Sequence, residues 1–163
     1  MVRAASPLQP RRVFRSAAGG ATFLPPAVCR QRRSALLAEA SGHAGQVEEG
    51  LCLLAEAVAV LEANGQGDLL PEAYRLRGAL LLRQAVPDTA QAETCFQQAL
   101  TIARQQQARS WELRAAVSLA RLWQRQGKWA EARELLAPIY GWFTEGFDTA
   151  DLQEAKALLK ALA

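Results

Sequence analysis

Apolar residues recur at helical spacing along most of the chain from about residue 34 onward. Leu51, Leu54, Val58 and Leu61 lie three or four residues apart, which places them on one face of a helix. A similar apolar face closes the chain, formed by Leu152, Ala155, Leu158, Leu159 and Leu162. Half of all residues are apolar, and Ala, Leu, Gln, Arg and Glu dominate, a composition that favours helix. The pattern predicts an all-α protein.

Turn signals divide the helical region, residues 34–163, into three helix pairs and a final helix. The pairs span about residues 34–65, 68–108 and 111–147. In the second pair, Pro71 lies in a first turn, where its missing N–H costs nothing. Asp88 is placed to cap the helix that follows it.

The third pair and the terminal helix carry their own signals. Trp123 and Trp129 flank the turn at Gly127, and we expect both to wedge the two helices together. Pro138 predicts a kink near Ala137, because it donates no backbone hydrogen bond. We expect Gly146 to end that helix and either Asp148 or Thr149 to cap the last one.

Small residues recur at corresponding positions of the three pairs. Ala38, Gly78 and Ala120 are separated by 40 and 42 residues, a period typical of stacked helical hairpins. We interpret the small residues as points where neighbouring helices approach closely. The positions in this repeat are Ala38, Gly45, Gly78, Ala92, Phe96, Ala99, Ala120, Gly127 and Ala132.

This small–Gly–small–large–small pattern resembles the tetratricopeptide repeat (TPR), over about residues 34–147 and most strongly in LARLWQRQGKWAEARELLAPI. The resemblance implies a right-handed superhelical stack of three TPR-like hairpins plus a C-terminal capping helix. The period exceeds the usual length of about 34 residues, which implies longer helices. The first unit departs from the family in having Gly50 in place of alanine and Ser41 where an aromatic is common. A HEAT- or armadillo-like stack is the alternative.

A closer resemblance runs from AETCFQQAL to DLQEAKALL and covers most of residues 70–163. This stretch looks like the C-terminal TPR region of large bacterial multidomain signalling ATPases of the cyclase or transcriptional-regulator type. The resemblance implies a helical arm that regulates such a core by binding protein partners. Two alternatives stay open: a regulatory subunit of a separately encoded ATPase or cyclase, and a truncated remnant without independent activity.

The net charge of +3 conceals an uneven distribution. Residues 1–33 hold seven Arg and no acidic residue, whereas residues 34–163 hold twelve basic and sixteen acidic residues. The helical domain is therefore mildly acidic, and we do not expect it to bind nucleic acid. The tail is also rich in Pro and Gly, and we expect it to be disordered. It is interpreted as a transit peptide, a solvated basic tail or a wrongly assigned gene start.

Catalytic motifs are missing from the sequence. There is no phosphate-binding loop, no G-x-S-x-G elbow and no H-E-x-x-H motif. The one histidine, His43, lies near a predicted turn, and we expect it to be an exposed turn residue. Cys29, Cys52 and Cys95 form no C-x-x-C pair, so we expect no disulfide or metal site, and we interpret Cys52 and Cys95 as small core or half-buried residues. These observations predict a non-enzymatic cytoplasmic protein without cofactor or membrane span.

One set of residues remains as a candidate binding surface. In a stack of helix pairs the first helices line the concave face, and five arginines lie on those helices: Arg75, Arg83, Arg114, Arg121 and Arg125. Their spacing keeps those of each helix on one side. Because guanidinium forks suit carboxylates, we expect a protein or peptide partner with acidic residues. The alternative is a solvated face neutralised by Glu72, Glu112 and their neighbours.

The first pair has no evident polar cap on its outer face, although helical arrays usually need one. We therefore expect either self-association through this first repeat or continuation into a longer array.

Overall fold

The computed structural model describes residues 38–39, 42, 45–63 and 67–163. In this part of the chain every regular element is a helix and no strand is present, which confirms the predicted all-α fold class. Residues 38, 39 and 42 are helical. The elements that follow are α2 (Val47–Ala63), a 3-10 turn η1 (Gly67–Leu69), α3 (Leu70–Leu81), α4 (Thr89–Gln105), α5 (Arg109–Arg125), α6 (Trp129–Tyr140) and α7 (Ala150–Ala161). Our predictions for residues 1–33, Ser41 and His43 fall outside the described residues.

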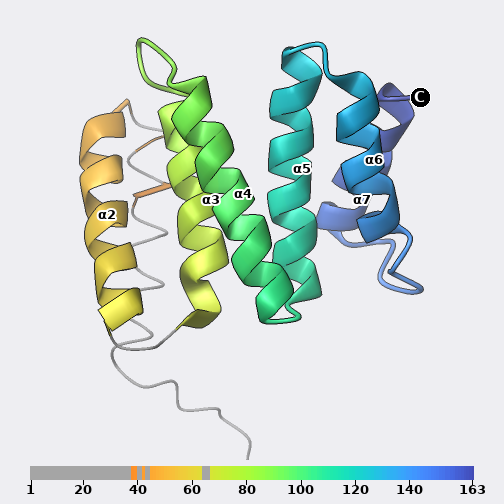
Figure 1. Ribbon diagram of the computed structural model, residues 1–163, viewed down its shortest axis with the longest axis horizontal. Coiled ribbons are helices and arrows are strands. Elements are labelled where there is room, and N and C mark those ends of the chain that lie inside the picture. Colours follow the sequence, from red (N-terminus) through yellow and green to blue (C-terminus); the bar gives the residue numbers. More distant parts are fainter. Residues whose placement is uncertain (1–37, 40–41, 43–44, 64–66) are drawn as a thin grey trace, which may run out of the picture.

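Successive helices stand side by side and run in alternating directions, from α2 in orange to α6 in blue (Figure 1). Each helix packs on the next, and α3 also packs on α5, while α7 packs on both α5 and α6. The first helices of consecutive pairs therefore line one side of the stack. None of the helices in the described ranges is long and apolar enough to span a membrane.

A continuous apolar core joins the last two pairs to α7. It contains Ala99, Leu113, Ala116, Ala120, Ala132, Leu136, Leu152 and Ala155. The alanines at the predicted repeat positions 38, 92, 99, 120 and 132 are all fully buried. Alanine at these points lets neighbouring helices come together without a void or a clash.

Gly78 of α3 makes room for Phe96 of α4. A Cβ atom at residue 78 would lie 2.6 Å from Cε1 of Phe96, closer than two carbon atoms can pack. The Phe96 ring is itself almost fully buried. The small residue predicted at this position therefore allows an aromatic ring to fill the space between the two helices.

Gly50 of α2 allows a close approach to the backbone of the preceding helix. A Cβ atom there would lie 3.0 Å from the carbonyl oxygen of Ala38. The glycine that replaces the family's alanine therefore lies where the backbones at Gly50 and Ala38 are in close contact.

Gly45 and Gly127 do not have the role that the repeat pattern assigned to them. Both have positive φ, +83° and +80°, and no neighbouring atom lies within 4 Å of a Cβ built on either residue. After α5, the Gly127 N–H bonds to the Gln124 carbonyl and the Lys128 N–H bonds to the Trp123 carbonyl. This is the Schellman arrangement that ends a helix with a left-handed residue. These glycines turn the chain, which confirms the turn predicted at Gly127, whereas the interpretation that they mark a close helix contact is wrong.

The ends of α6 and α7 also differ from the prediction. α6 ends at Tyr140 and not near Gly146. It continues past Pro138, and the chain leaves the helix where the Trp142 and Phe143 N–H groups bond only three residues back, to the Ile139 and Tyr140 carbonyls. Thr149 is the first flanking residue of α7, but its hydroxyl donates to the Gly146 carbonyl and no side chain caps the helix. By contrast, the predicted Asp88 cap is confirmed, since its carboxylate accepts a 2.9 Å hydrogen bond from the Gln91 N–H.

The two tryptophans beside Gly127 differ from each other. Trp123 packs against the core and donates its indole N–H to Glu93 at 2.8 Å, so it links α5 to α4, the last helix of the preceding pair. Trp129 is half exposed. It lies at the first position of α6 and faces outward, and the prediction that it also wedges the helices is wrong.

Cys95 and Cys52 are expected to react at very different rates. Burial raises the pKa of the Cys95 thiol, whereas Cys52 lies on the exposed side of α2. The prediction of a core or half-buried residue is therefore confirmed for Cys95 and wrong for Cys52. In a Cys29→Ser variant, iodoacetamide should label Cys52 long before Cys95, because only an accessible thiolate is alkylated. Mass spectrometry of the native protein measures both rates, and equal rates would contradict this placement.

Candidate functional site

The structure brings all five predicted arginines to the same side of the stack. Arg75 lies on α3 and Arg83 follows its end, while Arg114, Arg121 and Arg125 lie on α5. The two helices are neighbours in space although α4 separates them in the sequence. The arginines surround two adjoining hollows, which share Arg75, Ser118 and Arg121.

The larger hollow lies between α3 and α5 and measures about 310 Å³. We call it the α3–α5 hollow. Four arginines surround an apolar floor that includes the buried Phe96 ring, and no carboxylate is among its lining residues. The lining consists of Arg75, Ala79, Leu82, Arg83, Phe96, Ser118, Arg121, Leu122 and Arg125. Such a surface offers both guanidinium donors and a place for an apolar side chain.

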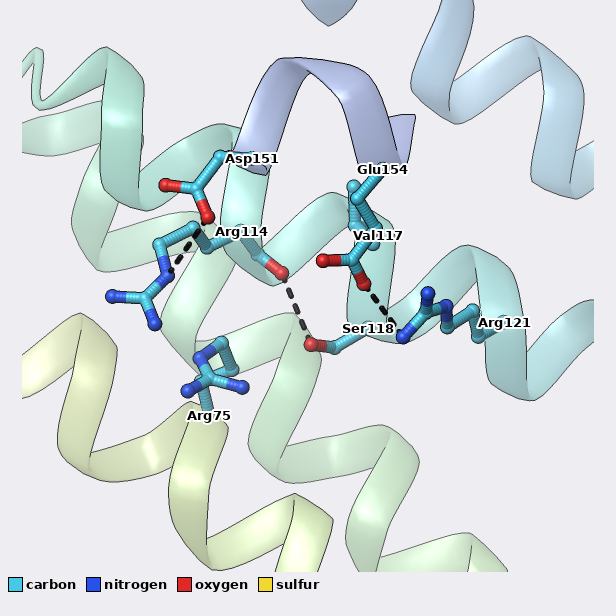
Figure 2. Close-up of a pocket in the computed structure, with 7 residues that line it drawn as sticks. All are labelled: Arg75, Arg114, Val117, Ser118, Arg121, Asp151 and Glu154. Carbon is cyan, nitrogen blue, oxygen red and sulfur yellow. Dashed lines mark hydrogen bonds and ion pairs between the residues drawn. The ribbon is translucent and has the colours of Figure 1, made fainter. Parts of the chain in front are cut away.

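The smaller hollow lies between α5 and α7 and measures about 100 Å³. We call it the α5–α7 hollow. Figure 2 shows Asp151 and Glu154 of α7 reaching over α5 toward Arg114 and Arg121. Glu154 Oε1 lies 2.6 Å from Arg121 Nη1, and Asp151 Oδ1 lies 3.7 Å from Arg114 Nε. This hollow therefore already contains carboxylates that pair with its arginines.

Glu72 of α3 ties α3 to α5. Its carboxylate accepts two 2.8 Å hydrogen bonds from Arg75 and lies 3.1 Å from Arg114 Nη1. Burial by itself lowers the pKa of Arg75, but the hydrogen bond and charge of Glu72 outweigh it and raise the pKa. Arg75 therefore stays charged and firmly held. Glu72 therefore neutralises the charge of Arg75. For this arginine, the alternative interpretation of a neutralised face holds.

Glu112 is different, and the suggestion that it neutralises the arginine face is wrong. Its side chain is only 5% exposed and accepts hydrogen bonds from Arg104 at 2.9 Å and Arg109 at 2.7 Å. Arg109 in turn lies 4.0 Å above the ring of Trp142. Glu112 thus joins the end of α4 to the start of α5, away from the five arginines.

Arg121 and Arg125 are the arginines of α5 best placed to meet a ligand. Arg121 is about half exposed and pairs with a partly exposed Glu154. Arg125 is exposed, and none of the described carboxylates forms an ion pair with it. Arg125 therefore adds positive charge to the α3–α5 hollow, whereas two other arginines of its lining, Arg75 and Arg121, pair with Glu72 and Glu154.

Asp151 and Glu154 were not anticipated from the sequence as part of this site. Their spacing shows only that they lie on the polar side of a terminal helix. Which arginines they meet depends on how α7 docks on α5, and the apolar face of α7 does not specify that geometry. Among the residues that the structure places, no group of three or more His, Cys, Asp or Glu side chains is arranged to hold a metal ion.

No protein-family model matches the sequence, and no curated protein matches it significantly. Two crystal structures of nearly identical TPR-like repeats, described as a kinesin light chain of Podosopora anserina, are similar to this chain. One, a point variant of those repeats, is 21% identical with a TM-score of 0.44, and covers 82% of this chain and 84% of its own. The other is 22% identical with the same TM-score, and covers 85% and 86%. At this level of identity and TM-score, neither structure informs the binding site. The site is therefore judged from its own geometry.

Proposed function

We propose that this protein is a non-enzymatic protein-interaction scaffold whose α3–α5 hollow binds an acidic segment of a partner protein. The observation that carries the proposal is the ring of Arg75, Arg83, Arg121 and Arg125 around an apolar floor. Helical hairpin stacks offer extended concave surfaces suited to such binding.

The chemistry of the lining favours a segment that combines carboxylates with bulky apolar residues. A guanidinium fork binds a carboxylate through two hydrogen bonds. Ala79 and Leu82, the partly exposed apolar residues of the lining, can meanwhile contact an apolar side chain of the same segment, and the burial of that side chain supplies a favourable free energy of binding. A segment with only carboxylates, or only apolar residues, would make fewer of these contacts and should bind more weakly.

The hairpin stack supports placing the chain among TPR-like repeat proteins. Two features agree with the alternation of small and large residues in that family. The alanines of the repeat are buried, and the Phe96 ring packs against Gly78. We further propose that it works in a bacterial cytoplasm as the C-terminal regulatory arm of a signalling ATPase or transcriptional regulator, as the sequence resemblance implies. A subunit that completes a separately encoded ATPase or cyclase has the same binding requirement. Measurable ATP hydrolysis by the purified chain alone would contradict the non-enzymatic role.

An acidic probe peptide is expected to bind this hollow through Arg125. The probe is a short fluorescein-labelled peptide in which glutamate alternates with leucine, and its affinity is measured by fluorescence anisotropy. Arg125→Glu should weaken binding about tenfold or more, because it replaces an attraction with a like-charge repulsion. Added salt should also weaken binding to the wild-type protein.

Arg133→Glu provides the matched control for this experiment. Arg133 is an exposed residue of α6 and does not line either hollow. The control makes the same change in net charge and should leave the affinity close to that of the wild type. Equal losses in the two variants would mean that the probe responds only to overall charge, and the proposed site would be wrong.

Self-association through the first helix pair is a separate proposal. Val60 on α2, in the first helix pair, is 45% exposed, and we propose that a second copy of the chain covers it. A dimer that light scattering detects in the wild type but not in Val60→Glu would support it. A strict monomer at all concentrations would contradict it.

A further inference from the structure

We infer that Glu154 of α7 is a built-in competitor for Arg121, which a partner in the α3–α5 hollow must displace in order to use that arginine. This inference rests on the proposed function of the hollow. It names the feature that a partner needs: two carboxylates spaced to meet Arg121 and Arg125 together.

Arg121 lies at the border of both hollows, so its guanidinium can serve either one. In the structure it pairs with Glu154 at 2.6 Å, from the α7 side. The two side chains are 53% and 38% exposed. An ion pair this exposed contributes little free energy, so an incoming carboxylate can replace Glu154.

The exchange requires movement of the Glu154 side chain and not of α7. Leu152, Ala155 and Leu158 anchor α7 in the core. Removing the helix would expose all of this apolar surface to water, at a cost well above that of one surface ion pair. We therefore place the competition at one carboxylate on a fixed helix.

Asp151 on the same helix should not compete in this way. Its partner Arg114 is already held by the largely buried Glu72 at 3.1 Å, and the Asp151 contact is longer at 3.7 Å. Arg114 also does not line the α3–α5 hollow. Neutralising Asp151 should therefore leave binding in that hollow almost unchanged.

The spacing of the arginines defines the partner. Arg121 and Arg125 are four residues apart on one helix, which places their Cβ atoms about 6 Å apart on the same side. A segment with one carboxylate can pair with the exposed Arg125 and leave the Glu154–Arg121 pair intact. A segment with two suitably spaced carboxylates gains the second arginine only by displacing Glu154.

Two probe peptides test this inference with the full-length chain. The diacid probe contains Glu-Leu-Glu and the monoacid probe contains Glu-Leu-Gln in the same flanking sequence. Glu154→Gln should strengthen binding of the diacid probe by about two- to fivefold, the range of an exposed ion pair. The same variant should leave the monoacid probe unchanged, and Asp151→Asn should change neither affinity.

Glu134→Gln is the charge control, because Glu134 is an exposed residue on α6. If Glu154→Gln and Glu134→Gln strengthen binding equally, or if both probes gain equally, the effect is one of overall charge and the inference is wrong. If the wild type binds the diacid probe through Arg125 but Glu154→Gln has no effect, only this inference fails. If neither probe binds the wild type, the proposed function fails and the inference with it.

Discussion

Replacing Phe96 with alanine is expected to lower the free energy of unfolding by about 3–5 kcal/mol. Phe96 is one of the largest side chains of the described core and only 1% exposed. It fills the space between α3 and α4 and packs with Leu81, Ala92, Leu119 and Leu122. Urea denaturation followed by circular dichroism measures the loss. A loss below about 1 kcal/mol would mean that the ring does not fill this core.

Gly78 provides a matched test of the same contact. In the wild type, Gly78→Ala should be neutral or destabilising, because overpacking against the buried ring costs about 1–3 kcal/mol and offsets a helix-propensity gain of about 1 kcal/mol. In a Phe96→Ala background the ring is gone, so the same substitution should stabilise the protein. A coupling of about 1–2 kcal/mol between the two sites is expected. Additive effects would contradict the close contact between residue 78 and the ring.

Glu112→Ala is expected to destabilise the protein by about 2 kcal/mol, on the scale of one charge-assisted hydrogen bond. The carboxylate is buried and accepts a hydrogen bond from each of Arg104 and Arg109, and such bonds contribute about 1.5–3 kcal/mol each in favourable cases. We expect less than their sum, because both arginines are partly exposed and regain water. The substitution should also release Arg109 from the Trp142 ring and change the tryptophan fluorescence. Glu131→Ala, at an exposed position of α6, should cost far less. Equal losses would contradict the role given to Glu112.

The repeat could be predicted from the sequence because the sizes of facing side chains limit how closely helices pack. Ala120 and Ala132 are buried where the pattern placed them. The pattern could not separate the two uses of glycine, since Gly78 faces a ring while Gly127 only turns the chain. That distinction depends on the backbone φ angle and not on residue size.

The arginine face was predictable for a related reason, whereas its carboxylates were not. Intervals of seven and four residues place Arg114, Arg121 and Arg125 on one side of any α-helix. Glu154 reaches Arg121 only because α7 docks across α5, an arrangement set by contacts between distant segments. The arginines of the candidate site could therefore be predicted from the sequence, but the pairing of Glu154 with Arg121 could not.

The most direct test of the binding-scaffold account is to map the diacid probe by NMR, using the side-chain Nε–H signals of isotope-labelled arginines. The account predicts that Arg121 and Arg125 shift on titration, while Arg133 on α6 and the Glu112-bound Arg104 stay in place. Shifts at Arg104 or Arg133 without any at Arg121 and Arg125 would contradict it.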